Sequence, residues 1–209
     1  GEVRMNGRAL GAHTPAELAL CRALMPQESA VAFDFTAREI VALGRFPHRR
    51  APRQARDGHG GEDGIIEEAM ACTEVQALAA RVLNTLSGGE KARVHLARAL
   101  AQLWHPRGDG AQRWLLLDEP TAALDLHHQH SAMRLLRQWA DDGVGAVMVL
   151  HDLNLARRYA DDVIVLDGEG GVLQGPAGEV MDAGLIERVW RTPCQSVGSA
   201  DGTPQYLFG

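Results

Sequence analysis

The stretch Leu86–Glu90 (LSGGE) constrains the fold most, because it defines where a helix starts. Ser87 and Glu90 have the spacing of a capping box, in which each side chain accepts a hydrogen bond from the other residue's backbone N–H. Apolar residues then recur at helical spacing as far as Leu103, which predicts a helix after Ser87. Two glycines occupy its first turn, where each is about 1 kcal/mol less favourable than Ala. They indicate either an approaching anion such as phosphate, or a flexible capped start without a ligand.

A second constraint is the apolar run Trp114–Leu117, which ends directly at Asp118 and Glu119. Four consecutive apolar residues predict a parallel-sheet strand that is buried on both faces. Ligands of such sheets bind at the carboxyl ends of the strands, where the two acids emerge. Adjacent acids there favour a bound cation; the alternative is that they cap the next turn. A second buried strand is predicted at Gly145–Leu150, and it ends at His151.

The order of these patterns predicts an α/β protein with a helical insertion. Residues 1–33 and 105–190 are assigned to an α/β core, residues 34–104 to an all-helical subdomain, and residues 191–209 to a C-terminal tail. The tail is rich in Gly, Pro and Ser, and we predict that it is poorly ordered. Capping residues and periodicity predict helices that begin at Thr14, Thr36, Ile65, Val75, Ser87, Leu126 and Leu153. A solvated loop is predicted at Arg49–Gly64.

Composition excludes several classes of function. The net charge of −6 argues against a broad basic surface for nucleic acid. The three cysteines are scattered, which indicates a reducing compartment and no disulfide framework. No apolar run approaches the roughly 18 residues that a membrane-spanning helix needs. His127, His128 and His130 cluster at one helix start, and we interpret them as surface or interface residues because further converging metal ligands are not apparent.

With LSGGE, LLLDEP, a downstream ALD and a strand-end histidine in this order, the chain resembles the ATP-binding subunit of ABC transporters. The resemblance covers residues 1 to about 190 and implies a P-loop NTPase core with an inserted helical subdomain. It also implies ATP and Mg²⁺ as cofactors. In this family, phosphoryl transfer depends on positioning and charge neutralisation, with little covalent work for the protein.

The resemblance assigns three residues to the magnesium ion and the attacking water. Asp118 matches the Walker B aspartate, which holds Mg²⁺ through water. Glu119 matches the general base that polarises the attacking water. Gln27, in MPQ, matches the Q-loop glutamine, which contacts Mg²⁺ or that water and lies beside the permease; a polar loop residue is the alternative reading of Gln27 taken alone.

Five further residues are assigned to the nucleotide and the dimer. Ser87, Gly88 and Gly89 match the signature that binds the γ-phosphate held by the opposite subunit. Asp125 matches the D-loop aspartate at the dimer seam. His151 matches the switch histidine that senses the γ-phosphate.

One departure from the family pattern is serious. A P-loop of the form GxxxxGK[ST] should precede these motifs, and the 209 residues contain none; Lys91 is the only lysine. We expect an N-terminal truncation on the order of 30 residues or more, the scale of one βαβ unit, with the first strands and the P-loop missing. A naturally degenerate, catalytically dead subunit is the alternative. The 209-residue chain alone is therefore predicted to bind Mg-ATP poorly and not to hydrolyse it, and micromolar affinity in a calorimetric titration would refute this.

The transported substrate is inferred only from resemblance. The segments VALGRFPH, RWLLLDEPTAALDLHHQH and VLHDLNLARRYADDVIVL are similar to importers of iron chelates, haem and cobalamin, above all to haem (hemin) importer ATPases. A ferric-siderophore or cobalamin importer is the alternative. A non-transport ABC ATPase is disfavoured by the lack of tandem halves or long coiled coils.

The same resemblance implies partners and a location. A second copy of the subunit would form a head-to-tail nucleotide sandwich dimer. A transmembrane permease dimer would contact residues 33–50, and a periplasmic substrate-binding protein would act indirectly. No nucleic-acid partner is expected. The predicted location is peripheral, on the cytoplasmic face of the bacterial inner membrane.

Overall fold

The structure, a computed structural model, describes residues 1–27, 33–200 except 51–60, and 202–209. The chain divides into two compact units, Gly1–Val149 and Leu150–Gly209, which are described separately. Among the described residues, no helix is long and apolar enough to cross a membrane. The helices and strands of the first unit are β1 (Arg4–Met5), β2 (Arg8–Ala9), η1 (Leu10–Ala12), α1 (Pro15–Cys21), β3 (Arg22–Met25), α2 (Ala37–Leu43), η2 (Phe46–Arg50), α3 (Gly61–Cys72), η4 (Gln76–Leu78), η5 (Leu83–Thr85), α4 (Gly88–Gln102), β4 (Arg113–Asp118), α5 (Leu126–Asp141) and β5 (Val144–Val149).

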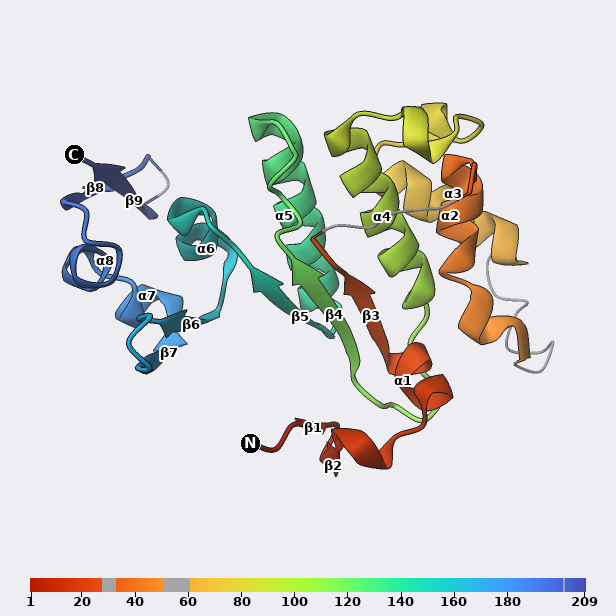
Figure 1. Cartoon of the computed structure of the whole chain (residues 1–209), viewed down its shortest axis with the longest axis horizontal. Helices are drawn as coiled ribbons and strands as arrows, with labels where there is room; N and C mark the ends of the chain where they lie inside the picture. Colours follow the sequence, from red (N-terminus) through yellow and green to blue (C-terminus); the bar gives the residue numbers. More distant parts are fainter. Residues whose placement is uncertain (28–32, 51–60, 201) are drawn as a thin grey trace. The chain divides into compact units, whose positions relative to one another are not determined.

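A three-stranded parallel sheet in the order β3-β4-β5 forms the centre of the first unit (Figure 1). One face of this sheet is covered by α4 and α5. Leu115 and Leu117 of β4 face these helices, and both are buried. The cluster between sheet and helices consists of Ala23, Met25, Leu96, Ala99, Leu100, Leu103, Leu115, Leu117, Leu124, Ala132, Leu136 and Val144.

The other face of the sheet is open, which corrects the prediction of strands buried on both faces. Leu24, Leu116 and Val147 are register neighbours on this face. Leu24 and Val147 are each 52% exposed, and Leu116 is only half-buried. The apolar run of β4 therefore reflects a sheet with one helix-covered face and one face that no described helix of this unit seals.

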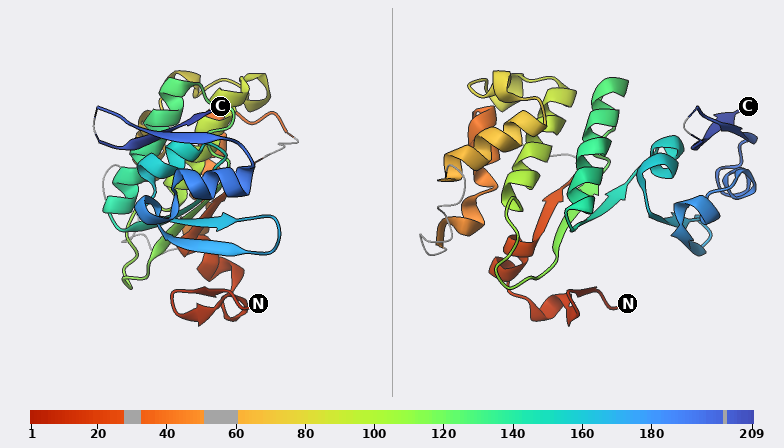
Figure 2. Two further views of the ribbon diagram at one scale, coloured as in Figure 1. Left: turned by 90° about the vertical axis from the view of Figure 1, so that its left-hand side faces the viewer. Right: turned by 180° about the vertical axis from the view of Figure 1, so that it is seen from behind.

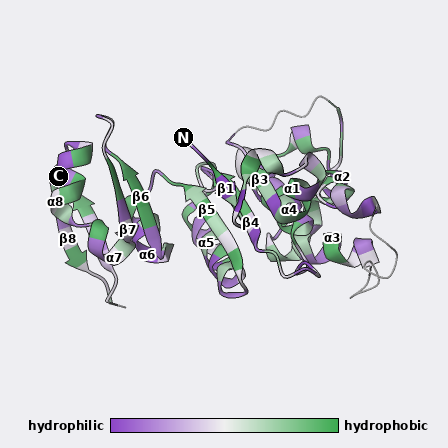
Figure 3. Cartoon of the chain, turned by 90° about the horizontal axis from the view of Figure 1, so that it is seen from below, coloured by the Kyte–Doolittle hydropathy of each residue, from purple (hydrophilic) through white to green (hydrophobic). Residues whose placement is uncertain are grey.

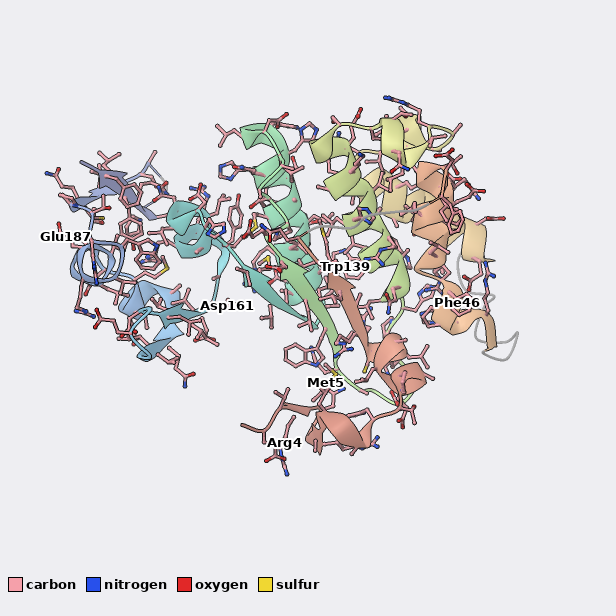
Figure 4. All side chains as sticks on the ribbon, in the orientation of Figure 1. Arg4, Met5, Phe46, Trp139, Asp161 and Glu187 are labelled. Carbon is pink, nitrogen blue, oxygen red and sulfur yellow. The ribbon has the colours of Figure 1, made fainter. Side chains whose placement is uncertain are left out.

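The helical part of the first unit has a hydrophobic cluster of its own. Helices α2, α3 and α4 lie together on one side of the sheet (Figure 1). The buried members of this cluster are Ala37, Ile40, Val41, Ile65, Ile66, Ala69, Met70, Val75, Leu83, Leu86, Val94, Ala97 and Ala101. Trp104 contacts both clusters and packs edge-on against Trp139 of α5, with 5.5 Å between ring centroids. Figure 4 labels Trp139. Helix α4 thus supplies apolar residues to both cores.

One predicted helix start and one whole predicted helix in this region were wrong. Helix α3 begins at Gly61, earlier than Ile65, because Glu62 and Asp63 form its acidic first turn. The expected helix at Val75–Leu83 is absent from the described residues, and two 3₁₀ turns, η4 and η5, take its place. The remainder of the loop predicted at Arg49–Gly64 lies largely outside the described residues.

The described residues of the second unit form two hairpins and three helices, and α8 lies between the hairpins (Figure 2). Its elements are α6 (Leu153–Tyr159), β6 (Asp162–Leu166), β7 (Val172–Pro176), α7 (Ala177–Val180), α8 (Ala183–Trp190), β8 (Cys194–Gly198) and β9 (Pro204–Phe208). Most of β6 is apolar (green in Figure 3), although Ile164 and Leu166 are more than two-thirds exposed.

The predicted poor order of residues 191–209 was wrong. Cys194–Gly198 and Pro204–Phe208 pair antiparallel, and Cys194 and Tyr206 are buried in the small core of the unit. The Gly- and Ser-rich segment between them connects the two strands of the hairpin. Glycine and serine content alone does not distinguish a hairpin turn from a disordered tail.

Candidate functional site

The acidic pair Asp118 and Glu119 lies at the carboxyl end of β4, as the sequence predicts. Asp118 is the last residue of the strand and lies opposite Val149 of β5. Glu119 follows with a φ of +50°, the left-handed region that non-glycine residues rarely adopt. Its backbone N–H donates to the Val149 carbonyl at 3.2 Å, which holds the turn in place. Such strain at the end of a strand is common at functional sites, where the surrounding structure maintains it.

The structure brings Gln27 and Glu119 together, although 92 residues separate them in sequence. Gln27 follows β3, the neighbour of β4, so both residues emerge at the same edge of the parallel sheet. The Gln27 amide Nε2 donates to Glu119 Oε2 at 2.9 Å. The Gln27 and Glu119 side chains thus meet beside Asp118. Together these three side chains place several oxygen atoms at one edge of the sheet.

This donor set fits a magnesium ion that shares its coordination with a phosphate group. Mg²⁺ prefers oxygen ligands and is usually bound through one or two carboxylates plus substrate phosphates. Among the described residues, no group of three or more His, Cys, Asp or Glu side chains could hold a metal ion. The carboxylates of Asp118 and Glu119 and the amide oxygen of Gln27 are the oxygen atoms at this edge of the sheet that could contribute to such a site.

The capping box at the start of α4 forms as predicted. Glu90 Oε2 accepts from the Ser87 N–H at 2.7 Å, and Ser87 Oγ accepts from the Glu90 N–H at 3.3 Å. The Ser87 backbone N–H, followed by the Ser87 side chain, lowers the pKa of Glu90. Ser87 and Gly88 are exposed, so the amides of the first turn remain accessible to solvent. An accessible helix N-terminus of this kind favours a bound anion.

The two glycines of the signature have different environments. A Cβ on Gly89 would lie 2.9 Å from the Ala123 carbonyl oxygen of the same chain, so close backbone packing alone explains this glycine. A Cβ on Gly88 would meet only the Ala123 Cβ, at an ordinary 3.6 Å. Packing within the described part of the chain therefore gives no reason for a glycine at position 88.

Asp125 and the neighbouring histidines stabilise the start of α5. Asp125 is the N-cap and accepts from the His128 backbone N–H at 2.9 Å. That bond, followed by one from the His128 ring, lowers the pKa of the Asp125 carboxyl. His128 Nε2 lies 3.9 Å from Glu74, while the His127 and His128 rings pack edge to face. Within the described chain these contacts make His128 a link between the start of α5 and the segment after α3.

His151 belongs to the second unit, where it is exposed and precedes the Asp152 N-cap of α6. Asp152 Oδ1 accepts from the backbone N–H groups of Asn154 and Leu155, at 2.8 and 3.0 Å. Sequence analysis missed Asn154, whose side chain bonds to the backbone of β9. No local pattern could have identified it, because its partner, Tyr206, is 52 residues away.

These features define the class of protein. A parallel sheet with an acidic pair at the end of a central strand, together with a helical insertion, is the α/β architecture of P-loop NTPases of the ABC type. The family described as ABC transporter matches residues 1–122. The chain belongs to the ABC transporter family of ATP-binding proteins.

Two curated relatives support the family assignment. The chain is 46% identical over 195 residues to the hemin import ATP-binding protein HmuV of Nocardia farcinica, covering 93% of this chain and 63% of that protein. It is also 46% identical over 207 residues to the HmuV protein of Burkholderia thailandensis, covering 96% of this chain and 74% of that protein. The chain thus spans somewhat less than two thirds of the length of the Nocardia relative.

Solved structures show the same fold. A putative metal-chelate type ABC transporter in an inward-facing conformation matches with a TM-score of 0.73 at 22% identity, over 90% of this chain and 73% of that one. An ATP-binding cassette solved as a dimer in a post-hydrolysis state, bound to ADP and Pi, matches with a TM-score of 0.67 at 29% identity. That alignment covers 85% of this chain and 73% of the other chain.

Proposed function

We propose that the protein is the ATP-hydrolysing subunit of an ABC importer for haem, at the cytoplasmic face of the bacterial inner membrane. The observation that supports hydrolysis most directly is the bond between Gln27 and Glu119 beside Asp118. The similarity to hemin import ATP-binding proteins supports haem as the substrate. A ferric siderophore or cobalamin is the second candidate, because the segments that resemble haem importers also resemble importers of iron chelates and cobalamin.

In this proposal the residues at the edge of the sheet divide the work of hydrolysis. Bound Mg²⁺ would neutralise charge on the phosphates of ATP. Asp118 would hold the ion through water, and Gln27 would contact the ion or the attacking water. Glu119 accepts the proton of that water as it attacks, with its carboxylate oriented by the Gln27 amide. His151, which belongs to the second unit, would sense the γ-phosphate as the family resemblance implies.

The signature residues act on the nucleotide of a second copy. Ser87, Gly88 and Gly89 would bind the γ-phosphate held by that copy, and Asp125 would lie at the seam of a head-to-tail dimer. The solved cassette bound to ADP and Pi is itself a dimer, which supports this arrangement. The accessible amides at the start of α4 supply the chemistry for phosphate recognition.

We further propose that residues 33–50 contact the permease dimer, with a periplasmic binding protein acting indirectly. The described part of this segment carries exposed apolar side chains at Phe33, Leu43 and Phe46, and Figure 4 labels Phe46 on the helical side of the unit. We keep the division into an α/β core (1–33 and 105–190), a helical subdomain (34–104) and a C-terminal segment (191–209). The hydrophobic cluster that α2, α3 and α4 share supports the helical subdomain, while α4 also contributes residues to the cluster under the sheet.

The decisive experiment replaces the general base. The test uses a permease-bound chain that includes the P-loop expected before Gly1, because the 209 residues alone are predicted not to hydrolyse ATP. In that protein Glu119→Gln is expected to lower ATP hydrolysis about a hundredfold or more, because the attacking water loses its proton acceptor. Nucleotide binding should be retained. Glu68→Gln, an exposed change on α3, is the matched control. Wild-type turnover in Glu119→Gln would refute the assignment.

The substrate is tested separately in vesicles that contain the complete transporter. Uptake of haem, a ferric siderophore and cobalamin is compared in the presence of ATP, with Glu119→Gln as the background. ATP-dependent uptake of haem alone supports the proposal. Uptake of either other compound in its place assigns the transporter to that substrate, and failure to co-purify with any permease favours a non-transport ATPase.

A further inference from the structure

We propose that the C-terminal hairpin β8–β9 sets the position of His151, and that Asn154 is the positioning residue through which it acts. This inference rests on the proposed function, because it takes His151 as the residue that senses the γ-phosphate. The role proposed for the hairpin depends on contacts within the second unit alone.

Asn154 joins the first turn of α6 to β9 through both ends of its side-chain amide. Its Oδ1 accepts from the Tyr206 N–H at 2.7 Å, and its Nδ2 donates to the Tyr206 carbonyl at 3.2 Å. The side chain thus pairs with the backbone of β9 as a neighbouring strand would. We call this pair of bonds the Asn154 clamp. A two-point contact fixes both the distance and the orientation of the helix turn against the strand.

The hairpin that carries the other half of the clamp is built into the core of the unit. Four residues form its buried cluster, and two of them, Cys194 and Tyr206, come from the hairpin. Tyr206 is 3% exposed, and its hydroxyl donates to the Met181 carbonyl. Leu153 and Ala156 of α6 pack against the same cluster. The strand therefore provides α6 with a rigid support.

His151 lies close to the clamp along the chain. It is three residues before Asn154 and is followed by Asp152, whose carboxylate caps the same turn. Because Asp152 accepts from the Asn154 backbone N–H, the cap and the clamp fix one and the same residue from two sides. The chain enters α6 from His151 through this fixed turn. If the turn loosens, the position of the His151 imidazole is therefore less well defined.

The two bonds of the Asn154 clamp can be removed while the β8–β9 hairpin stays packed in the core of the unit. Asn154→Ala deletes both bonds to β9 and keeps the hairpin sequence. Tyr206→Phe is the matched control: it removes the hydroxyl bond to Met181 and retains the backbone N–H and carbonyl that form the clamp. Both variants are expected to lower the melting temperature. Only the loss of the clamp should change the geometry at His151.

Three measurements on the permease-bound protein test the idea. Asn154→Ala should lower ATP turnover about tenfold with little change in KM, because a small displacement of a positioned group reduces rate strongly. Tyr206→Phe should remain near wild type in turnover. The double variant His151→Ala/Asn154→Ala should be no slower than His151→Ala, since both changes remove the same function. Amide hydrogen exchange at residues 151–155 should accelerate in Asn154→Ala and not in Tyr206→Phe.

Each alternative outcome has a definite meaning. Wild-type turnover in Asn154→Ala, or multiplied losses in the double variant, would overturn the positioning role. If His151→Ala hydrolyses ATP like the wild type, the sensor role in the proposed function fails, and hydrogen exchange then decides the inference alone. Unchanged exchange at residues 151–155 in Asn154→Ala overturns it under every result for His151.

Discussion

The two ends of α4 are built in opposite ways. At the N-terminal end, Ser87 and Gly88 are exposed, and the capping box closes only two bonds. At the C-terminal end, three basic side chains from elsewhere in the chain bond to the last carbonyl groups. Arg45 donates to the Ala101 carbonyl at 2.7 Å, the His48 ring bonds to that of Gln102 at 2.7 Å, and Arg113 donates to that of Leu103.

This difference follows the helix dipole. Cations at a helix C-terminus are favourable, and anions are favourable at the N-terminus. The guanidinium groups of Arg45 and Arg113 supply positive charge at one end, and the amides are left accessible at the other. Arg45 is further held by both oxygens of Glu62, at 2.9 and 3.2 Å, and its side chain is only 6% exposed. The C-terminal end of α4, which we call the closed end, thus anchors the helix. The N-terminal end, which we call the open end, remains available for a ligand.

The largest effect on stability is expected at the closed end. Arg45→Ala removes the bond to Ala101 and leaves the Glu62 carboxylate without its partner, which should lower the free energy of unfolding by about 3 kcal/mol. Arg38→Ala is the matched control, because Arg38 forms ion pairs with Asp63 and Glu67 on the surface and should change stability by less than about 1 kcal/mol. Urea unfolding measures both. If the two substitutions lower the free energy of unfolding equally, the buried Arg45 contacts stabilise the protein no more than a surface ion pair does.

The next effect separates function from stability at the open end. Gly88→Ala should lower ATP hydrolysis about a hundredfold, because the methyl group covers an amide that would bind phosphate. The same change should raise the stability of α4 by up to about 1 kcal/mol, since Ala is the better helix former and the new Cβ meets only Ala123 at 3.6 Å. Gly89→Ala should lower both ATP hydrolysis and stability, because its new Cβ would lie too close to the Ala123 carbonyl oxygen. Wild-type hydrolysis by Gly88→Ala would show that the open end has no ligand.

What could be predicted from the sequence was the open end. The capping box of Ser87 and Glu90 joins residues three apart, so local spacing reveals it, and the same holds for Thr36 and Glu39. The closed end could not be predicted, because Arg45 reaches a carbonyl 56 residues away. The contact between Gln27 and Glu119 likewise depends on strand order, and family resemblance alone suggested that the two residues share a site.

The errors have the same origin. Trp114–Leu117 reads as a fully buried strand, yet the exposure of Leu24 and Val147 on its open face depends on what covers the sheet. Composition alone predicts poor order of residues 191–209, yet their order comes from the burial of Tyr206 and the bonds to Asn154. Local signals locate helix starts and strands; burial and long-range pairing depend on the packed fold.

Two matched capping boxes give the third prediction. Ser87→Ala should lower stability by about 1 kcal/mol, because the Glu90 N–H loses its acceptor. Thr14→Ala at the start of α1, which has the same box with Glu17, should lower stability by a similar amount. Only Ser87→Ala should also slow ATP hydrolysis. Equal turnover in the two variants would mean that the hydroxyl of Ser87 serves the helix alone.

The smallest effect is expected from His48 as the pH is lowered. Burial, followed by the charge of Arg45, lowers the pKa of the His48 imidazole from its usual 6.5. The unfolded chain therefore binds a proton at a higher pH than the folded chain does. The stability that neutral His48 contributes is complete above about pH 6.5 and is lost as the pH falls toward the lower pKa of the folded state. His95 acts in the same direction, because burial lowers its pKa to about 4.

The pH dependence of the unfolding free energy, measured in single variants, separates the contribution of His48 from that of His95. Unfolding free energies measured between pH 7.5 and 5 should fall less in His48→Gln than in the wild type, and His95→Gln should show a separate reduction. If His48→Gln reproduces the wild-type slope, the pKa of His48 is the same in the folded and the unfolded protein, and burial beside Arg45 does not destabilise its protonated form. The bond of the His48 ring to the Gln102 carbonyl would then offset the effect of burial, because it favours the protonated imidazole.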